Sequence, residues 1–141
     1  MPQSNNSRPS WEEYALAVAT VASKRSEDPY QKVGACILRK DNSVAGVGYN
    51  GAPKGIEIDW SNRDERRKRV VHAEVNAVRY SAPGECYLLA STLLPCNECL
   101  RMIASYGIRK VIFKQIYIQD YSSLDLAKEF NIDLIDAGTW K

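Results

Sequence analysis

The chain has 141 residues, of which 45% are hydrophobic and 26% are charged, and its formal net charge is +2. This length and composition predict one globular domain that buries a core, and they exclude a disordered or fibrous protein. No apolar run approaches the roughly 20 residues needed to span a bilayer, and the small positive charge lacks the strong basic footprint of a dedicated nucleic-acid binder.

The N-terminal residues predict the cellular compartment of the protein. Residues 1–9 are polar and are expected to form a disordered tail, so the single domain is expected to cover residues 10–141. The tail lacks the apolar stretch of a secretory signal, and we therefore expect a cytoplasmic protein without a membrane partner. Cysteines in that compartment stay reduced, so Cys36 and Cys86, which lie in apolar runs, are expected to be small buried hydrophobes.

The N-terminal half predicts a helix followed by a β-hairpin. Ser10-Trp11-Glu12-Glu13 has the form of a capping box, and apolar residues recur behind it at helical spacing to about Arg25. Two strands are predicted at residues 33–39 and 43–49, joined by a tight turn. Residues 50–55, rich in Gly and Pro, are expected to form a loop.

From Val71 onward, helices and strands are predicted to alternate. The expected helices cover about residues 72–81, 96–106 and 124–130, and the expected strands cover 85–90, 110–114 and 133–136. A hairpin followed by this alternation predicts a mixed sheet with parallel strands flanked by helices. The fold class is therefore expected to be α/β.

Three candidate metal ligands stand at two predicted helix starts. His72 is the only histidine and opens a His-Ala-Glu triplet, while Cys96 and Cys99 form a Pro-Cys-x-x-Cys motif. Structural zinc normally takes four protein ligands, whereas catalytic zinc takes three and keeps a position for water. Helix starts also present unpaired N–H groups that stabilise thiolate. These residues predict a catalytic zinc site.

Glu74 follows His72 by two residues and is the predicted catalytic acid–base. Each motif alone has a common structural explanation, because a Cys-x-x-Cys pair is often a redox pair or half a zinc knuckle, and a lone histidine is usually just hydrogen-bonded. The order His-x-Glu then Pro-Cys-x-x-Cys, with a strand between, is typical of zinc nucleobase deaminases. In that chemistry, Glu74 would accept a proton from the activated water, deliver it to the ring nitrogen, and in a later transfer protonate the departing amine.

These motifs support a family resemblance. From about Trp11 to Phe113 the chain resembles the deoxycytidylate (dCMP) deaminases of the cytidine deaminase superfamily, and residues 24–29, 33–37 and 46–53 match as well. The resemblance implies a cytidine deaminase-like three-layer α-β-α sandwich with a central mixed five-stranded sheet, in a homo-oligomer that is a hexamer or a dimer. It also implies hydrolysis of dCMP to dUMP and ammonia in pyrimidine nucleotide metabolism, with dCTP or CMP as further candidate substrates.

The resemblance implies substrate contacts too. Asn50 would hydrogen-bond the deoxyribose, although an Asn-Gly pair also simply makes a turn. The backbone of Ala73 would face the pyrimidine edge. Tyr117 is the candidate to stack on the base, with Tyr121 as its competitor, and both are also candidates for plain packing.

Phosphate recognition has two candidate segments. The resemblance points to Arg25 and Ser26, because an arginine fork suits phosphate oxygens, while the alternative for Arg25 is a helix C-terminal charge in solvent. Residues 63–69 carry an excess of Arg and Lys. Such a run is more often a solvated face than a site, but it leads into His72, so one of its arginines is a secondary candidate at the mouth of the pocket or across a subunit boundary.

The resemblance further predicts cofactors and effectors. Some phage members carry a second, structural zinc on extra histidines, which this chain lacks, so one zinc per subunit is expected. Family members are also often activated by dCTP with Mg²⁺ and inhibited by dTTP, which makes these nucleotides candidate effectors.

Two other functions share parts of the pattern. A deaminase of bases in tRNA or single-stranded nucleic acid would carry the same zinc centre but should show a broader basic surface and aromatic stacking platforms. The mild charge counts against it, and no nucleic-acid partner is expected. A non-enzymatic zinc-binding interaction module would leave Glu74 unexplained.

Overall fold

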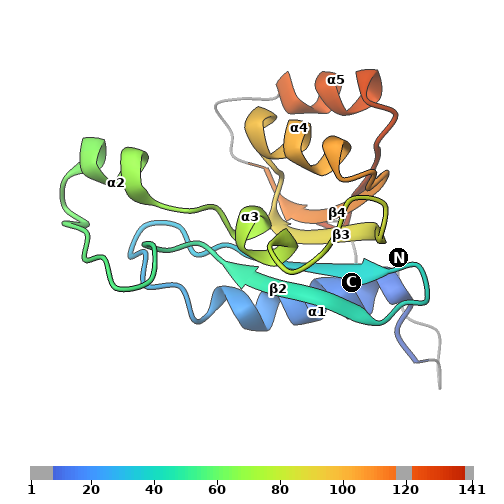
Figure 1. Ribbon diagram of the computed structural model, residues 1–141, viewed down its shortest axis with the longest axis horizontal. Helices are drawn as coiled ribbons and strands as arrows, with labels where there is room; N and C mark the ends of the chain where they lie inside the picture. The colour runs from blue at the N-terminus through green and yellow to red at the C-terminus, as the bar shows by residue number, and fades with distance from the viewer. Residues whose placement is uncertain (1–7, 117–121, 139–141) are drawn as a thin grey trace.

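A five-stranded mixed sheet forms the centre of the molecule, in the order β2-β1-β3-β4-β5 (Figure 1). The computed structural model describes residues 8–116 and 122–138. The strands are β1 (Gly34–Arg39), β2 (Val44–Tyr49), β3 (Cys86–Leu93), β4 (Lys110–Gln115) and β5 (Asp133–Asp136). β1 runs antiparallel to β2 and β3, whereas β3, β4 and β5 are mutually parallel neighbours. The predicted mixed sheet is confirmed.

Helices cover both faces of this sheet. They are α1 (Trp11–Ser23), α2 (Arg63–Arg69), α3 (Ala73–Val78), α4 (Asn97–Ser105) and α5 (Ser122–Glu129). α1 packs on one face, while α3, α4 and α5 contribute to the core on the other, which gives the expected three layers (Figure 1). None of the helices in the described ranges combines the length and the apolar character that crossing a membrane requires.

Each central strand is buried on both faces, so its side chains alternate between two cores. In β1, Cys36 and Leu38 pack in the cluster beneath α1, whereas Ala35 and Ile37 belong to the cluster beneath α3 and α4. This explains why the strand reads as a continuous apolar run. Cys36 is fully buried, and burial raises the pKa of its thiol to about 12. Cys86 is 2% exposed, so both cysteines are buried as predicted.

The N-terminal cap of α1 has the predicted form. The hydroxyl of Ser10 accepts a hydrogen bond from the Glu13 N–H at 3.1 Å, and the Glu13 carboxylate accepts one from the Ser10 N–H at 2.8 Å. Together these contacts satisfy two N–H groups that a helix start otherwise leaves unpaired. The capping box is confirmed, and it fixes the start of the helix at Trp11.

α3 lies directly on β2 because two glycines of that strand carry no side chain. A Cβ added at Gly46 would lie 1.9 Å from the carbonyl oxygen of Ala77, and one added at Gly48 would lie 2.6 Å from that of Ala73. Contacts this short are not tolerated, so only glycine allows the approach. The strand thereby sets the position of the short helix that begins after His72.

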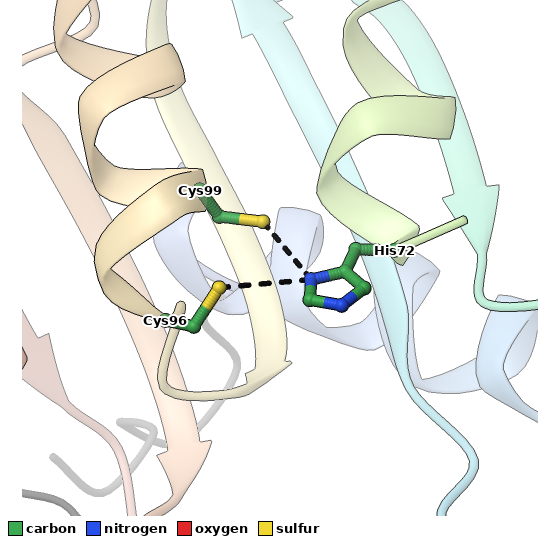
Figure 2. A group of neighbouring side chains, drawn as sticks. All are labelled: His72, Cys96 and Cys99. Carbon is green, nitrogen blue, oxygen red and sulfur yellow. Dashed lines mark hydrogen bonds between the residues drawn. The ribbon is translucent and has the colours of Figure 1, made fainter. Parts of the chain in front are cut away.

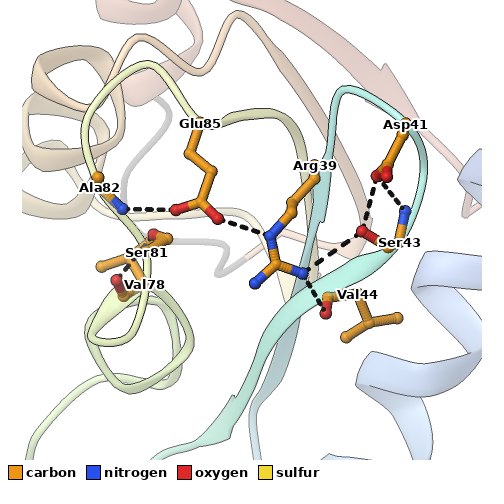
Figure 3. A network of polar contacts seen from close by, with 8 residues as sticks. All are labelled: Arg39, Asp41, Ser43, Val44, Val78, Ser81, Ala82 and Glu85. Atoms are coloured by element: carbon orange, nitrogen blue, oxygen red, sulfur yellow. Dashed lines mark hydrogen bonds and ion pairs between the residues drawn. The ribbon is translucent and has the colours of Figure 1, made fainter.

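A polar network closes the far end of the hairpin (Figure 3). The Glu85 carboxylate accepts hydrogen bonds from Arg39 Nε at 2.5 Å and from the Ala82 N–H at 2.8 Å. Arg39 also donates to the carbonyl oxygen of Val44 at 3.0 Å. The end of β1 is therefore tied both to β2 and to the turn that precedes β3.

The charged run at residues 63–69 forms a helix, α2, which the sequence analysis did not assign. Asn62 caps this helix, since its side-chain oxygen accepts from the Glu65 N–H at 3.0 Å. None of its residues is buried, and Glu65 and Arg66 are half-buried. In Figure 1, α2 stands apart from the helices that cover the sheet.

Candidate metal centre and catalytic cavity

The three candidate ligands meet where two helices begin. His72 is the N-cap of α3 and Cys96 is the N-cap of α4, and neither side chain makes a capping hydrogen bond. Both side chains are therefore available to a ligand. Cys99 lies in the first turn of α4 and is 3% exposed. The starts of α3 and α4 thus bring together two exposed candidate ligands, His72 and Cys96, and one buried candidate ligand, Cys99.

Their geometry fits a tetrahedral zinc ion. The Nδ1 atom of His72 lies 3.3 Å from the sulfur of Cys99 and 3.6 Å from that of Cys96. Figure 2 shows both sulfurs facing this nitrogen, and all three ligand atoms lie within 4.8 Å of one another. Zn–S bonds of roughly 2.3 Å and Zn–N bonds of roughly 2.0 Å at tetrahedral angles separate N from S by about 3.5 Å. The residues therefore match a zinc site through Nδ1.

The electrostatics of the cluster favour a thiolate at Cys96. Hydrogen bonding from the Cys99 thiol, and then from His72, lowers the pKa of Cys96 to about 4 despite partial burial. The same contact with Cys96 raises the pKa of Cys99, and hydrogen bonding to Cys96 raises the pKa of His72. A divalent cation at this point would replace the protons that now link the three side chains.

Glu74 lies in the first turn of α3 and is 4% exposed. Burial raises the pKa of its carboxyl group to about 7, against a smaller lowering by hydrogen bonding to the backbone. A general acid–base works best when its pKa lies near the working pH, because both protonation states are then accessible. The side chain that the sequence selected as the proton carrier has this property.

One cavity of about 390 Å³ brings the predicted residues together. His72, Ala73, Glu74 and Cys96 line it, and the Leu93-Leu94-Pro95 segment at the end of β3 adds an apolar wall. A volume of this order is that of a small-molecule site with a few convergent polar groups. The arrangement can hold a metal ion and a proton carrier against one small ligand.

Asn50 also lines this cavity, but its side chain is already bonded within the protein. Its oxygen accepts from the Val33 N–H at 2.9 Å, and its nitrogen donates to the Gln31 carbonyl at 2.8 Å and to the Asp28 carboxylate at 3.3 Å. Both N–H donors are therefore in use. Asn50 shapes the cavity wall by holding the segment before β1, and its deoxyribose contact stays a prediction.

The first phosphate candidates lie outside the cavity lining. Arg25 is exposed and is not among the residues that line the cavity. Ser26 is 3% exposed, and its hydroxyl donates to the Asn50 carbonyl at 2.9 Å and accepts from the Asp28 N–H at 3.2 Å. Tyr117 and Tyr121 lie outside the described residues, as do residues 1–7 of the predicted tail.

The cavity lining includes two arginines of the charged run 63–69, which the sequence analysis gave as the secondary phosphate candidate, and a serine that it did not single out. Arg66 and Arg67 of α2 and Ser123 of α5 line it. Arg66 donates to the Trp60 carbonyl at 2.9 Å and lies over the ring of Tyr30, with Cζ 4.0 Å from the centroid. An Asn-x-x-Glu pattern at residues 62–65 signals the start of α2 and could have identified the helix. No local pattern shows that two of its arginines face the cavity.

Comparison with known proteins shows which family the chain resembles. Residues 9–115 match the family described as the cytidine and deoxycytidylate deaminase zinc-binding region. The deoxycytidylate deaminase of Mus musculus is 41% identical over 113 residues, which are 73% of this chain and 64% of that protein. The deoxycytidylate deaminase of Mycobacterium phage D29 is 38% identical over 127 residues, covering 76% of this chain and 96% of the phage protein.

A solved structure matches the fold. The crystal structure of dCMP deaminase from the cyanophage S-TIM5, in complex with dCMP and dUMP, has a TM-score of 0.76 at 26% identity, over 93% of this chain and 99% of that chain. The present chain spans slightly less than two thirds of the mouse relative and almost all of the mycobacteriophage one. With its zinc-type ligand cluster and these matches, the chain belongs to the cytidine and deoxycytidylate deaminase family.

Proposed function

We propose that the protein hydrolyses dCMP to dUMP and ammonia in the cavity between α3 and the start of α4. The observation that carries this proposal is the position of Glu74, a buried carboxyl group with a pKa raised to about 7, in the same cavity as His72 and Cys96. A binding module needs the metal ligands but has no use for a proton carrier beside them. The family to which the chain belongs supports cytosine as the base.

His72 through Nδ1, together with Cys96 and Cys99, would hold one zinc ion. Zinc in a three-ligand site supplies Lewis acidity, which makes a water molecule nucleophilic near neutral pH. The protein fixes the three side chains before binding, because α3 rests on β2 and α4 follows β3 directly. Little reorganisation of the chain is then needed at the site.

Glu74 would perform the proton transfers. It accepts one proton from the attacking water and donates it to the ring nitrogen of the cytosine. It then accepts the second proton from the hydroxyl group now bonded to carbon 4 and delivers it to the amine, which leaves as ammonia while the carbonyl forms. The backbone of Ala73, which begins α3 between His72 and Glu74, would face the edge of the pyrimidine. Leu93, Leu94 and Pro95 would form the apolar wall of the cavity against which the base lies.

Glu74→Gln tests this mechanism. The amide keeps the size of the side chain but cannot accept the proton, so the variant should bind zinc at the wild-type ratio and lose turnover by at least about 100-fold. Glu98→Gln is the matched control, because Glu98 lies in the same metal region but is exposed and outside the cavity lining. Ammonia release by Glu74→Gln at the wild-type rate would refute the proposal.

A substrate panel tests the choice of cytosine nucleotide over nucleic acid. Cytidine, dCMP, CMP, dCTP and a cytosine-containing oligonucleotide would be compared for ammonia release, with and without dCTP and dTTP as effectors. We expect the highest kcat/KM with dCMP. Preference for the oligonucleotide would instead identify a nucleic-acid deaminase.

The wider properties proposed for the protein rest on its family. We propose a cytoplasmic homo-oligomer that is activated by dCTP with Mg²⁺ and inhibited by dTTP, with a single domain over residues 10–141. Support for these properties comes from the resemblance to deoxycytidylate deaminases. Size-exclusion chromatography with light scattering, with and without dCTP and Mg²⁺, tests the assembly and its response together.

A further inference from the structure

We propose that Arg66 and Arg67 of α2 bind the 5′-phosphate of the nucleotide, and that Tyr30 positions Arg66 for this contact. This inference rests on the proposed function and assigns the phosphate to α2 instead of the segment at Arg25 and Ser26. Arg66 and Arg67 line the cavity that also holds His72.

The first argument is that both arginines carry charge into the cavity without a carboxylate partner. Over residues 8–116 and 122–138, the ion pairs are Arg39–Glu85 and Lys110–Glu12, so neither Arg66 nor Arg67 takes part in one. A guanidinium group has five N–H donors, and the Trp60 carbonyl uses one donor of Arg66. Enough donors are left for a bidentate contact with phosphate oxygens.

The acidic side chain on this side of the cavity does not neutralise them. Asp28 lines the cavity and is 9% exposed, but its carboxylate accepts from the N–H groups of Tyr30 at 2.8 Å and Gln31 at 3.2 Å and from the amide of Asn50 at 3.3 Å. These bonds commit the carboxylate to the loop. Among the described residues, an anion entering the cavity therefore meets two guanidinium groups that no carboxylate neutralises.

The second argument is that Arg66 is held in place before any ligand binds. Its guanidinium lies 4.0 Å from the ring centroid of Tyr30, an attractive cation–π geometry, and its Nη1 donates to Trp60 at 2.9 Å. The backbone beneath this ring is in turn held, because the Tyr30 N–H donates to Asp28, which Asn50 also contacts. A pre-oriented side chain loses less freedom on binding than a mobile one, so the contact gains affinity.

The test separates the α2 arginines from other arginines of similar charge. Arg66→Ala and Arg67→Ala are compared with Arg69→Ala, which removes an exposed arginine of the same helix outside the cavity lining, and with Arg25→Ala. The readouts are kcat and KM for dCMP, and the inhibition constants of dUMP and of deoxyuridine, which lacks the phosphate. Thermal midpoint and bound zinc show that each variant is folded.

We expect Arg66→Ala to raise the KM for dCMP and the inhibition constant of dUMP by about 10- to 100-fold, as for the loss of a hydrogen bond to a charged group. The inhibition constant of deoxyuridine should stay within about 2-fold, and kcat should change far less than KM. Arg67→Ala should act in the same direction. Arg69→Ala and Arg25→Ala should leave all these constants near those of the wild type.

Two substitutions of Tyr30 test its role in positioning Arg66. Tyr30→Ala removes the ring under Arg66 and should raise the KM for dCMP by about 3- to 10-fold without changing zinc content, whereas Tyr30→Phe keeps the ring and should restore the wild-type KM. Equal effects of the two variants would refute the positioning role.

Other results contradict the arginine assignment without touching the proposed function. If the wild type deaminates dCMP but Arg66→Ala behaves like Arg69→Ala, the α2 site is refuted. If Arg25→Ala is the only variant that raises the KM for dCMP, the phosphate site lies at Arg25 and Ser26 instead of on α2. If the wild-type protein releases no ammonia from dCMP, it is the proposed function that fails, while dUMP binding to wild type and Arg66→Ala still tests the phosphate contact.

Discussion

The amide nitrogen of Asn50 donates a hydrogen bond to the carboxylate of Asp28 at 3.3 Å, across 22 positions of sequence. The same side chain accepts from the Val33 N–H and donates to the Gln31 carbonyl, and Asp28 accepts the Tyr30 N–H. The segment before β1 and the loop after β2 are therefore one unit. That unit forms one wall of the cavity.

Asn50→Ala should destabilise the protein and weaken substrate binding together. The substitution leaves the buried N–H of Val33 without its partner, which costs about 1–3 kcal/mol. Urea denaturation measures this loss, and the KM for dCMP should rise because the wall loosens. Asn76→Ala is the control, since the side chain of Asn76 makes exposed bonds, donating to the Tyr49 carbonyl at 2.9 Å and accepting from Arg79, and it holds no buried backbone N–H. Equal losses in the two variants would contradict a special role for Asn50.

His72→Ala should remove zinc and activity at once. Only two thiol ligands would be left, and two ligands hold zinc far more weakly than three. Metal analysis should fall from one zinc per chain to less than about 0.1, and added zinc should not restore turnover. Cys36→Ala should keep its zinc, because Cys36 is buried in the core beneath α1. Full zinc content in His72→Ala would show that the metal is bound elsewhere.

Gly48→Ala should impair catalysis through the backbone. The new Cβ would lie 2.6 Å from the carbonyl oxygen of Ala73 and 2.6 Å from the nitrogen of Ala77, so α3 must move. Such overpacking costs about 1–3 kcal/mol, and kcat should drop because His72 and Glu74 move with the helix.

Gly51→Ala is the control for this effect. The nearest atom to its added Cβ is Glu27 Oε1 at 3.9 Å, an ordinary contact. Thermal denaturation and kcat should both separate the two variants. Wild-type kcat in Gly48→Ala would mean that the contact between β2 and α3 does not set the site.

The Arg39–Glu85 contact should stabilise the protein in a pH-dependent way. Hydrogen bonds from the Ala82 N–H and then from Arg39 hold the pKa of Glu85 below its ordinary value of 4.5. A folded-state pKa below the unfolded one gives stability that is present above the unfolded pKa and is lost as the pH falls through the folded one. Glu85→Gln should therefore have a lower urea midpoint than wild type at pH 7, and the difference should shrink between about pH 5 and pH 3. A difference that stays constant over this range would contradict the assignment.

The candidate zinc ligands could be predicted from the sequence because they lie in short, recognisable motifs. One histidine, a Cys-x-x-Cys pair and predicted helix starts indicated the ligands that the structure brings together. The strand at residues 133–136 and the α1 cap also followed from local patterns. Periodicity and capping patterns involve residues that are close in sequence. Elements that depend on such local patterns can therefore be predicted without knowledge of the tertiary packing.

Arg66 and Asn50 show why the rest could not be predicted. Whether an arginine of a charged helix faces solvent or a cavity depends on how α2 is placed against distant residues such as Tyr30. The partners of Asn50 lie 17 to 22 positions away, and an Asn-Gly pair looks the same in a plain turn. Tertiary packing decides both cases.

The division of the candidate metal ligands between the starts of α3 and α4 would make a bound zinc ion a cross-link. His72 belongs to the helix that rests on the hairpin strand β2, and both cysteines belong to the helix that joins β3 to β4. A bound ion therefore couples the antiparallel part of the sheet to the parallel part. At a free zinc concentration 1,000 times the Kd, binding adds about 4 kcal/mol to global stability. Amide hydrogen exchange at the starts of both helices should slow in step with metal loading.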